Sequence, residues 1–247
     1  MVLEYVSPEG LRVDGRRPKE LRALSAGLGT LESADGSATF QMGNTKVMAS
    51  VFGPRETVLR SQEVHDRATL SCECAMAPFS TGGDRRRRGK SDRLATELTM
   101  VVRETLKEVV LLELLPRSQI DVCVQVLQAD GGVRGACLNA AMLALVDAGI
   151  PCRDLLAACS AGFLDGTPLL DLNHTEDAGG GPEVAVALET NLEKVVLLQM
   201  DHKMGREDYE AVLHLATEGC RAVGRFMRQM MLEHTRTLAS ARGAVQL

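Results

Sequence analysis

Two carboxylate residues, Asp177 and Glu183, stand at the two ends of the glycine-rich stretch DAGGGPE. A pair of carboxylates that flanks a reacting phosphate can deliver a proton to the leaving oxygen or hold a divalent metal ion. The same residues could also be ordinary solvent-facing acids in a glycine loop. Their types and spacing alone leave both interpretations open.

A glycine turn lies upstream, in the stretch LQADGGVRGACLNAAMLALVDAGIP, residues 127–151. The pattern predicts a strand that stops at the turn and a helix that begins at once. Gly131 and Gly132 would let backbone amides approach an anion, and the first turn of the helix, near Arg134, would direct unpaired N–H groups to the same point. A phosphate could bind there. The turn could instead need glycine only for its backbone dihedral angles.

Basic residues gather in and beside a glycine-rich segment, residues 80–92. A run of this kind is usually a solvated charge run, but it could also contact an RNA backbone, where arginine gives affinity without reading the base sequence. Both interpretations stay open. The arginines in or beside this segment are Arg85, Arg86, Arg87, Arg88 and Arg93. Arg67, in the separate stretch DRATL, is a further candidate for backbone contact and could also be an exposed arginine at a strand edge.

The composition bounds these possibilities. The chain has 247 residues, 45% of them hydrophobic and 25% charged, as expected of a globular protein that buries a sizeable core. The net charge of −5 means that nucleic-acid binding would depend on a local basic patch. The seven cysteines are an odd number, and we expect reduced thiols. Residues 1–10 have no basic n-region and no apolar run is long enough to span a membrane, so we expect a cytosolic or nuclear protein.

The periodicity of apolar residues predicts a mixed α/β fold whose second half mirrors the first. We expect one domain over residues 1–240 and a frayed tail at 241–247. Asp92 is the expected N-cap of the first helix. The predicted elements are antiparallel strands within 21–53, a strand at 67–79, a helix from Leu94 that continues until Pro116, a strand at 118–130, a helix from Arg134 to Ala148 ended by Gly149, two strands around an Asp165–Gly166 turn, a loop at 174–183, strands at 183–189 and 194–201, and a helix from Arg206 to about Thr237.

Eight motifs in order along the chain resemble those of the RNase PH family, and together they cover nearly its whole length. The resemblance implies an RNase PH-type domain of two related βαβα halves with left-handed crossovers, an exception to the usual handedness. The motifs are RVDGRR (12–17), ADGSA (34–38), GNTKV (43–47), MAPFSTG (76–82), PRSQIDV (116–122), LQADGG (127–132), DAGIPCRDL (147–155) and LLQMD (197–201).

Within that family the sequence resembles the exosome ring subunits. This implies a hetero-hexameric ring of RNase PH-like subunits, RNA-binding cap subunits and a separate catalytic exoribonuclease, through which single-stranded RNA is threaded from its 3′ end. It also implies RNA processing and decay, rRNA processing included, in the nucleus, nucleolus and cytoplasm. In active family members inorganic phosphate attacks the terminal linkage, and Mg²⁺ assists.

The resemblance assigns a role to the acidic pair and the glycine turn. Asp177 matches one catalytic carboxylate or metal ligand, whereas Glu183 replaces an aspartate, and the extra methylene moves its carboxylate by about 1 Å. Gly131, Gly132 and Arg134 match the phosphate-binding turn. Val133 replaces a hydroxyl-bearing residue, so at this position the backbone amide can still donate but the side chain cannot.

The resemblance also bears on the arginines. Arg93 matches the first of two adjacent arginines that grip RNA in active relatives, and Leu94 replaces the second. Leu94 falls on the apolar stripe of its helix, and we expect packing to account for it. Together with Val133 and Glu183, this change predicts a non-catalytic or nearly inactive ring subunit. The alternatives are a weakly active phosphate-dependent 3′-to-5′ exoribonuclease within the ring and a stand-alone enzyme that trims tRNA ends.

Overall fold

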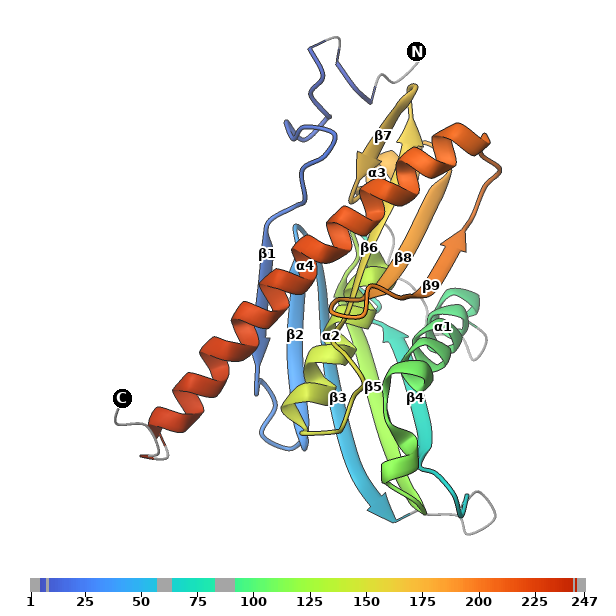
Figure 1. Cartoon of the computed structure of the whole chain (residues 1–247). Helices are drawn as coiled ribbons and strands as arrows, with labels where there is room; N and C mark the ends of the chain where they lie inside the picture. Colours follow the sequence, from blue (N-terminus) through green and yellow to red (C-terminus); the bar gives the residue numbers. More distant parts are fainter. Residues whose placement is uncertain (1–4, 8, 57–63, 83–91, 242, 244–247) are drawn as a thin grey trace.

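The computed structural model describes residues 5–7, 9–56, 64–82, 92–241 and 243 and forms two sheets with four α-helices (Figure 1). The five-stranded sheet has the order β1-β2-β3-β5-β4 and the four-stranded sheet the order β7-β6-β8-β9. The mixed α/β prediction is confirmed. The strands are β1 (Leu24–Leu28), β2 (Gly36–Met42), β3 (Thr45–Glu56), β4 (Thr69–Met76), β5 (Ser118–Gln128), β6 (Leu156–Leu164), β7 (Thr167–Leu170), β8 (Glu183–Glu189) and β9 (Val195–Met200), and the helices are α1 (Arg93–Val109), α2 (Val133–Asp147), α3 (His174–Asp177) and α4 (Arg206–Ala241).

The first sheet carries one buried face. β3 pairs antiparallel with β2 and β5, whereas β4 pairs parallel with β5, so the chain must cross over between β4 and β5. Helix α1 supplies that crossover, and Asp92 stands at its N-cap position with extended backbone, as predicted. The buried side chains of α1 recur at helical spacing and face β4 and α2.

The end of α1 differs from the prediction. The helix stops at Val109 and not at Pro116, and a short 3₁₀ turn, Leu112–Leu114, follows. The backbone leaves the helix because it pairs with a distant segment: the Leu111 N–H donates to the Pro151 carbonyl at 3.0 Å, and the Arg153 N–H donates to the Val109 carbonyl at 2.8 Å. A tertiary contact therefore overrides the local apolar periodicity.

Helix α2 lies between the two sheets and is buried on all sides from Gly135 to Leu145. A helix that is apolar all round belongs in a core. The one polar side chain in this stretch, Asn139, is satisfied by the backbone of Ala158 in β6, with bonds of 2.9 and 2.8 Å. One apolar cluster contains residues of both sheets, α1, α2 and α4, so α2 joins the two halves through a continuous core.

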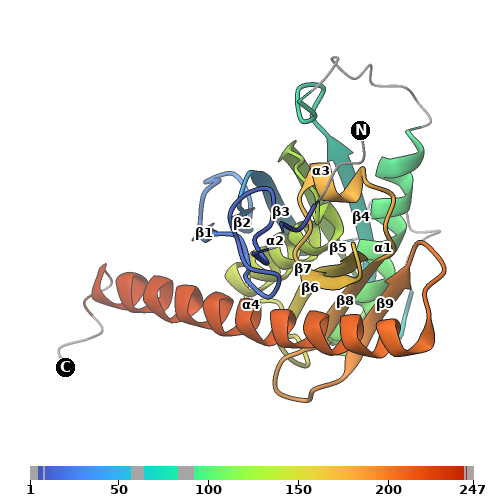
Figure 2. The ribbon, with the colours of Figure 1, turned by 90° about the horizontal axis from the view of Figure 1, so that it is seen from above.

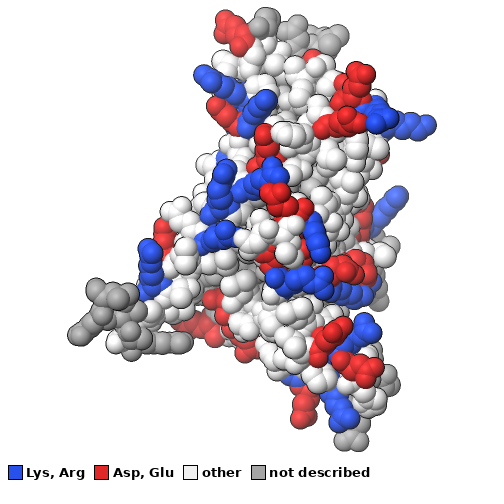
Figure 3. Space-filling model, viewed as in Figure 1, with Lys and Arg blue, Asp and Glu red and all other residues white. Residues whose placement is uncertain are grey.

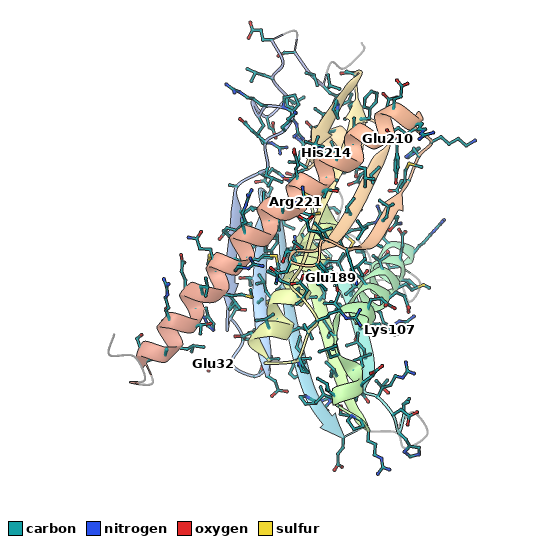
Figure 4. The ribbon with its side chains drawn as sticks, in the orientation of Figure 1. Glu32, Lys107, Glu189, Glu210, His214 and Arg221 are labelled. Atoms are coloured by element: carbon teal, nitrogen blue, oxygen red, sulfur yellow. The ribbon has the colours of Figure 1, made fainter. Side chains whose placement is uncertain are left out.

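Helix α4 crosses the four-stranded sheet and continues past β1 (Figures 1 and 2). Its buried residues end at Met227. Figure 4 places Glu210, His214 and Arg221 along its exposed side, and Figure 3 shows acidic and basic side chains interspersed over this face. Ala241, expected in a frayed tail, is still helical, and residues 242 and 244–247 lie outside the described part of the chain.

The cysteine prediction is confirmed, because all seven thiols are free. Burial raises the pKa of Cys72 to about 12 and that of Cys74 to about 11. These thiols are therefore protonated at neutral pH, and buried thiols of this kind are weak nucleophiles. Within the described residues, no helix combines the length and apolar character that a membrane crossing requires.

Candidate functional site

A pocket of about 290 Å³ opens where the turn after β5 meets α1, α3 and the second sheet. It brings together the predicted Gly131, Gly132, Arg134, Asp177 and Glu183, although these residues come from both halves of the chain. The full lining is Met76, Thr81, Gly82, Leu94, Glu97, Leu98, Ala129, Gly131, Gly132, Val133, Arg134, Gly135, Ser160, His174, Asp177, Glu183 and Asp201.

The glycine turn has features of both interpretations of its sequence: a backbone shape that needs glycine, and amides that could bind an anion. Gly131 and Gly132 have φ values of 75° and 60°, in the left-handed region that favours glycine, and a Cβ at Gly131 would lie 2.3 Å from the Leu172 carbonyl oxygen. The N–H groups of Gly131, Gly132 and Val133 meet no acceptor in the described part of the chain. The turn thus needs glycine for its shape and also presents unpaired donors at the N-terminus of α2.

Arg134 does not stand free beside this turn. Its Nη2 lies 2.8 Å from Oε1 of Glu97, and its Nη1 lies 2.8 Å from Oδ2 of Asp201 and 3.8 Å from Oε2 of Glu183. Burial alone would lower the pKa of Arg134, but Asp201, Glu97 and Glu183 outweigh it and raise that pKa above its ordinary value. The guanidinium is charged, and its charge is already neutralised by carboxylates.

The acidic segment is more ordered than the predicted loop. Residues His174–Asp177 form α3, a single helical turn capped by Asn173, whose side chain accepts from the Glu176 N–H at 2.9 Å while Glu176 bonds back to the Asn173 N–H at 3.0 Å. The expectation of a loop over residues 174–183 was therefore wrong at its start, because this reciprocal capping box fixes a helical turn. Asp177 is exposed at the end of that turn.

Glu183 begins β8 and is partly buried in the pocket. Burial raises its pKa above the ordinary value, and the negative charge of Asp177 adds to the rise, while Ser160 and Arg134 oppose it. A raised pKa suits a proton donor, since such a carboxyl keeps its proton to a higher pH than an ordinary glutamate does.

The donor set suits Mg²⁺ only in part. Asp177 and Glu183 offer carboxylate oxygens, and Mg²⁺ is commonly held by one or two carboxylates together with water and substrate phosphates. The described residues include no group of three or more His, Cys, Asp or Glu side chains arranged to hold a metal ion. These two carboxylates would hold Mg²⁺ jointly with a substrate phosphate, where the ion would neutralise developing negative charge.

The prediction for Leu94 was wrong. Leu94 is 49% exposed and lines the pocket, whereas Leu98, one turn further along α1, is 7% exposed and belongs to the core. Leu94 lies in the first turn of the helix, before the buried side chains begin. Packing in the core therefore does not account for leucine at this position.

The predicted RNA-binding arginines do not all gather at the pocket. Arg93 is exposed at the start of α1, next to the pocket-lining Leu94. Arg67 precedes β4, and because Thr69 is in register with Gln119, it lies at the opposite end of the first sheet from the turn that follows β5. Arg85, Arg86, Arg87 and Arg88 fall outside the described residues.

Several residues of the site were missed from the sequence. Glu97 follows Arg93 by one helical turn and so could have been placed on the same side of α1. Asp201 ends the LLQMD motif directly after β9. His174 and Ser160 carried no distinct signal, because each lies next to ordinary strand or loop residues.

Two buried arginines near the amino terminus were also missed. Arg12 is 3% exposed and bonds to Glu176 of α3, and Arg22 is 7% exposed and bonds to Asp171, which is fully buried. Arg12 belongs to the RVDGRR motif, so its presence was visible, but not its partner, since Glu176 is far away in sequence. These arginines attach the amino-terminal segment to α3 and to Asp171, which directly follows β7.

The chain is similar in sequence to known proteins over nearly its whole length. Residues 20–151 match domain 1 of the 3′ exoribonuclease family, and residues 154–219 match its domain 2. The chain is 55% identical over 243 residues to the exosome complex component RRP41 homolog of Arabidopsis thaliana, covering 98% of this chain and 100% of the relative. It is 47% identical to human exosome complex component RRP41, covering 95% and 96%.

Solved structures agree on the fold. Rice Rrp46 superposes with a TM-score of 0.77 at 29% identity, covering 88% of this chain and 98% of the other. A chain of the Archaeoglobus fulgidus exosome, determined with RNA bound to the active site, superposes with a TM-score of 0.75 at 23% identity, covering 87% and 91%. The second likeness is informative about the fold alone.

Proposed function

The chain is a member of the 3′ exoribonuclease family, and we propose that it is an RNase PH-like ring subunit of an RNA exosome. It assembles with other RNase PH-like subunits into a hetero-hexameric ring, which carries RNA-binding cap subunits and a separate catalytic exoribonuclease. The support is that the similar proteins named above are exosome components that match over nearly their full lengths. The ring acts in RNA processing and decay, including rRNA processing, in the nucleus, nucleolus and cytoplasm.

We further propose that this subunit forms part of the path for single-stranded RNA and contributes little or no catalysis itself. One observation carries this proposal: Arg134 is held by Glu97 and Asp201 at 2.8 Å each. Among the described residues that line the pocket, Arg134 is the one arginine or lysine, whereas four are carboxylates: Glu97, Asp177, Glu183 and Asp201. The described lining therefore carries net negative charge, which weakens the attraction of an attacking phosphate without removing the backbone donors of the glycine turn.

The substitutions at the pocket point the same way. Leu94 presents an exposed apolar side chain to the pocket, and Val133 offers no hydroxyl to a phosphate. Glu183 reaches further than an aspartate would. Each change weakens a different element of phosphorolysis: charge neutralisation, the side-chain contribution to phosphate binding, and placement of the acid.

Weak phosphorolysis within the ring is the second candidate. Asp177 and Glu183 still line one pocket with the unpaired amides of the glycine turn, and the pKa of Glu183 is raised, as suits an acid. Inorganic phosphate and Mg²⁺ would be required for this activity. No comparable observation favours the stand-alone tRNA-trimming enzyme.

Assembly is tested by the native mass of the chain, expressed alone and together with a second RNase PH-like subunit. We expect the chain alone to be poorly soluble, because exposed apolar residues such as Val195, Leu198 and Met200 lie on the edge strand β9, and we expect the second subunit to rescue it. A stable homohexamer, or a soluble monodisperse monomer, would contradict the heteromeric ring.

A further inference from the structure

Arg22 contacts the glycine turn from behind. Its Nη1 donates to the Asp130 carbonyl, and its Nη2 donates to the Gly131 carbonyl at 3.2 Å. The same guanidinium forms a two-pronged ion pair with Asp171, with Nε–Oδ2 at 2.8 Å and Nη2–Oδ1 at 2.6 Å. Arg22 is therefore locked in place by a fully buried carboxylate while it binds the backbone of the turn.

Thr45 supports the same arrangement from β3. Its fully buried hydroxyl donates to the Gly131 carbonyl at 2.7 Å and accepts from the Asp130 N–H at 3.1 Å. The carbonyls of both peptides that flank Gly131 thus face one buried cluster, made of Arg22, Thr45 and Asp171.

The orientation of these carbonyls fixes the orientation of the amides. In a trans peptide the C=O and N–H groups point in opposite directions. The Gly131 N–H shares a peptide with the Asp130 carbonyl, and the Gly132 N–H shares one with the Gly131 carbonyl. Because both carbonyls face Arg22, both N–H groups face away from it, and the two glycines that carry them line the pocket.

A buried hydroxyl lies beside the same amides. Ser160 is 4% exposed, lines the pocket, and its Oγ would be 3.6 Å from a Cβ placed on Gly132. It makes no hydrogen bond of ordinary geometry within the described residues, although it lies close enough to Glu183 to act against the rise of that carboxyl's pKa. A buried hydroxyl without a hydrogen-bond partner is available to donate to a ligand in the pocket.

We propose that Arg22 is a positioning residue, which turns the amides of Gly131 and Gly132 into the pocket so that they and the first amides of α2 bind a phosphate group. This subsite uses backbone donors, so it persists despite Val133. The identity of the ligand, either inorganic phosphate or a phosphate of RNA, rests on the proposed function. Because the charge of Arg22 is balanced by Asp171, its contribution is orientation rather than long-range attraction.

Arg12 provides a matched control. It is equally buried, pairs with Glu176 and donates to two backbone carbonyls, those of Leu170 at 2.5 Å and Asp171 at 3.0 Å, but it does not touch the glycine turn. Arg22→Lys and Arg12→Lys each keep the charge and remove the planar fork. Thr45→Val is a milder variant, because it removes the hydroxyl that bonds to the turn and changes the shape of the side chain little.

The experiment measures inorganic phosphate binding to the reconstituted ring by calorimetric titration, with single-stranded RNA as a competitor, and follows amide hydrogen exchange of residues 129–134. We expect Arg22→Lys to weaken phosphate binding roughly 10- to 100-fold, as misplacement of about 1 Å does elsewhere, and Thr45→Val to weaken it less. Arg12→Lys should stay within about twofold, because Arg12 bonds to the backbone carbonyl of Asp171 rather than to its carboxylate, while Arg22, Thr45 and the Asp171 carboxylate still hold the turn. Phosphate should slow exchange at Gly131 and Gly132 in the unmodified ring and in Arg12→Lys, but not in Arg22→Lys.

Equal losses in Arg22→Lys and Arg12→Lys, or an unmodified ring that binds no phosphate at this turn, would overturn the proposal. RNA that displaces the phosphate identifies an RNA phosphate as a ligand of the same subsite, and phosphate that remains bound identifies inorganic phosphate; either result supports the subsite. The proposed function fails by different measurements, namely native mass and release of nucleoside diphosphates. A catalytically active ring would therefore leave the contrast between the two arginines intact.

Discussion

The glycine turn at residues 130–134 and the acidic segment at residues 174–183 line one pocket but contribute in different ways. The turn offers backbone N–H groups, which are present whatever side chain follows the glycines. The acidic segment offers side-chain carboxylates, whose chemistry depends on their length and charge. A substitution such as Val133 leaves the first contribution largely intact, whereas a substitution such as Glu183 changes the second directly.

The two regions also differ in how firmly they are held. Arg22 and Thr45 bond directly to the peptides of the turn. Arg12 holds the acidic segment through Glu176, one residue before Asp177. Asp177 itself is exposed and is followed by Ala178 and three glycines. The turn proposed to bind phosphate is thus held by direct side-chain bonds to its backbone, whereas Asp177, the proposed acid or metal ligand, is held through its neighbour Glu176.

The largest effect on stability is expected when the support of the acidic segment is removed. Arg12→Met leaves Glu176 as a buried charge without its partner, and losses of this kind lower the free energy of unfolding by about 3–5 kcal/mol. Chemical denaturation of the ring subunit measures the change. The double variant Arg12→Met with Glu176→Gln should recover part of the loss, and an unchanged midpoint in the single variant would mean that this pair does not hold α3.

A large effect on chemistry is expected when the altered side chains are restored. In the assembled ring, Leu94→Arg with Val133→Ser and Glu183→Asp should raise phosphate-dependent release of nucleoside diphosphates at least ~100-fold, as gains of single donors and correct placement do elsewhere. The guanidinium introduced by Leu94→Arg would also offset the carboxylates around Arg134. Adding Asp177→Ala should abolish the gain. A silent triple variant would show that the missing function lies outside these three positions.

A moderate effect is expected for RNA affinity. Replacing Arg85–Arg88 and Arg93 with alanine should weaken binding of all RNA sequences alike and reduce the salt slope by roughly 0.7 for each RNA phosphate that is no longer neutralised. Titration of labelled single-stranded RNA at several salt concentrations gives both quantities. Arg67→Ala should change RNA binding less, because Arg67 lies at the far end of the first sheet. Unchanged RNA affinity and salt slope in the multiple variant would indicate that the basic segment is a solvated charge run that does not contact RNA.

The smallest effect concerns the pH dependence of stability. The pKa of Glu183 is raised in the folded state by burial and by Asp177, so its contribution is favourable below the unfolded value of about 4.3 and is lost as pH rises through the folded pKa. Above its folded pKa the charged Glu183 therefore opposes folding. Glu183→Gln should raise the thermal midpoint at pH 7 and lose this advantage toward pH 4. A midpoint difference that does not vary with pH would contradict the raised pKa.

Much of this architecture could be predicted because local patterns and tertiary structure agree. The strand, glycine turn and helix at residues 118–149 are set by alternation, left-handed glycines and an apolar run, and the structure has the same order. Gly149 ends α2 through bonds from its own N–H to Val146 and from Ile150 to Leu145, as its position predicted.

The rest depends on contacts between distant residues, which a single sequence does not reveal. Helix α1 ends early because the backbone after it pairs with Pro151. Arg134 forms ion pairs with both Glu97 and Asp201 because the fold brings α1 close to the residue that follows β9. The clamp from Arg22 to Gly131 likewise joins residues more than a hundred positions apart. Predicting that Asp177 and Glu183 share a pocket with the glycine turn required the family resemblance, since spacing alone left their role open.

The central claim, that this subunit shapes the RNA path but performs little or no phosphorolysis, is tested most directly in the reconstituted ring without the separate exoribonuclease. Single-stranded RNA and Mg²⁺ are supplied with and without inorganic phosphate, and nucleoside diphosphates are quantified. The account predicts RNA binding with diphosphate release at or barely above the level seen without phosphate, because Arg134 is held by Glu97 and Asp201 and the pocket is acidic. Robust phosphate-dependent release of nucleoside diphosphates, abolished by Asp177→Ala, would contradict it.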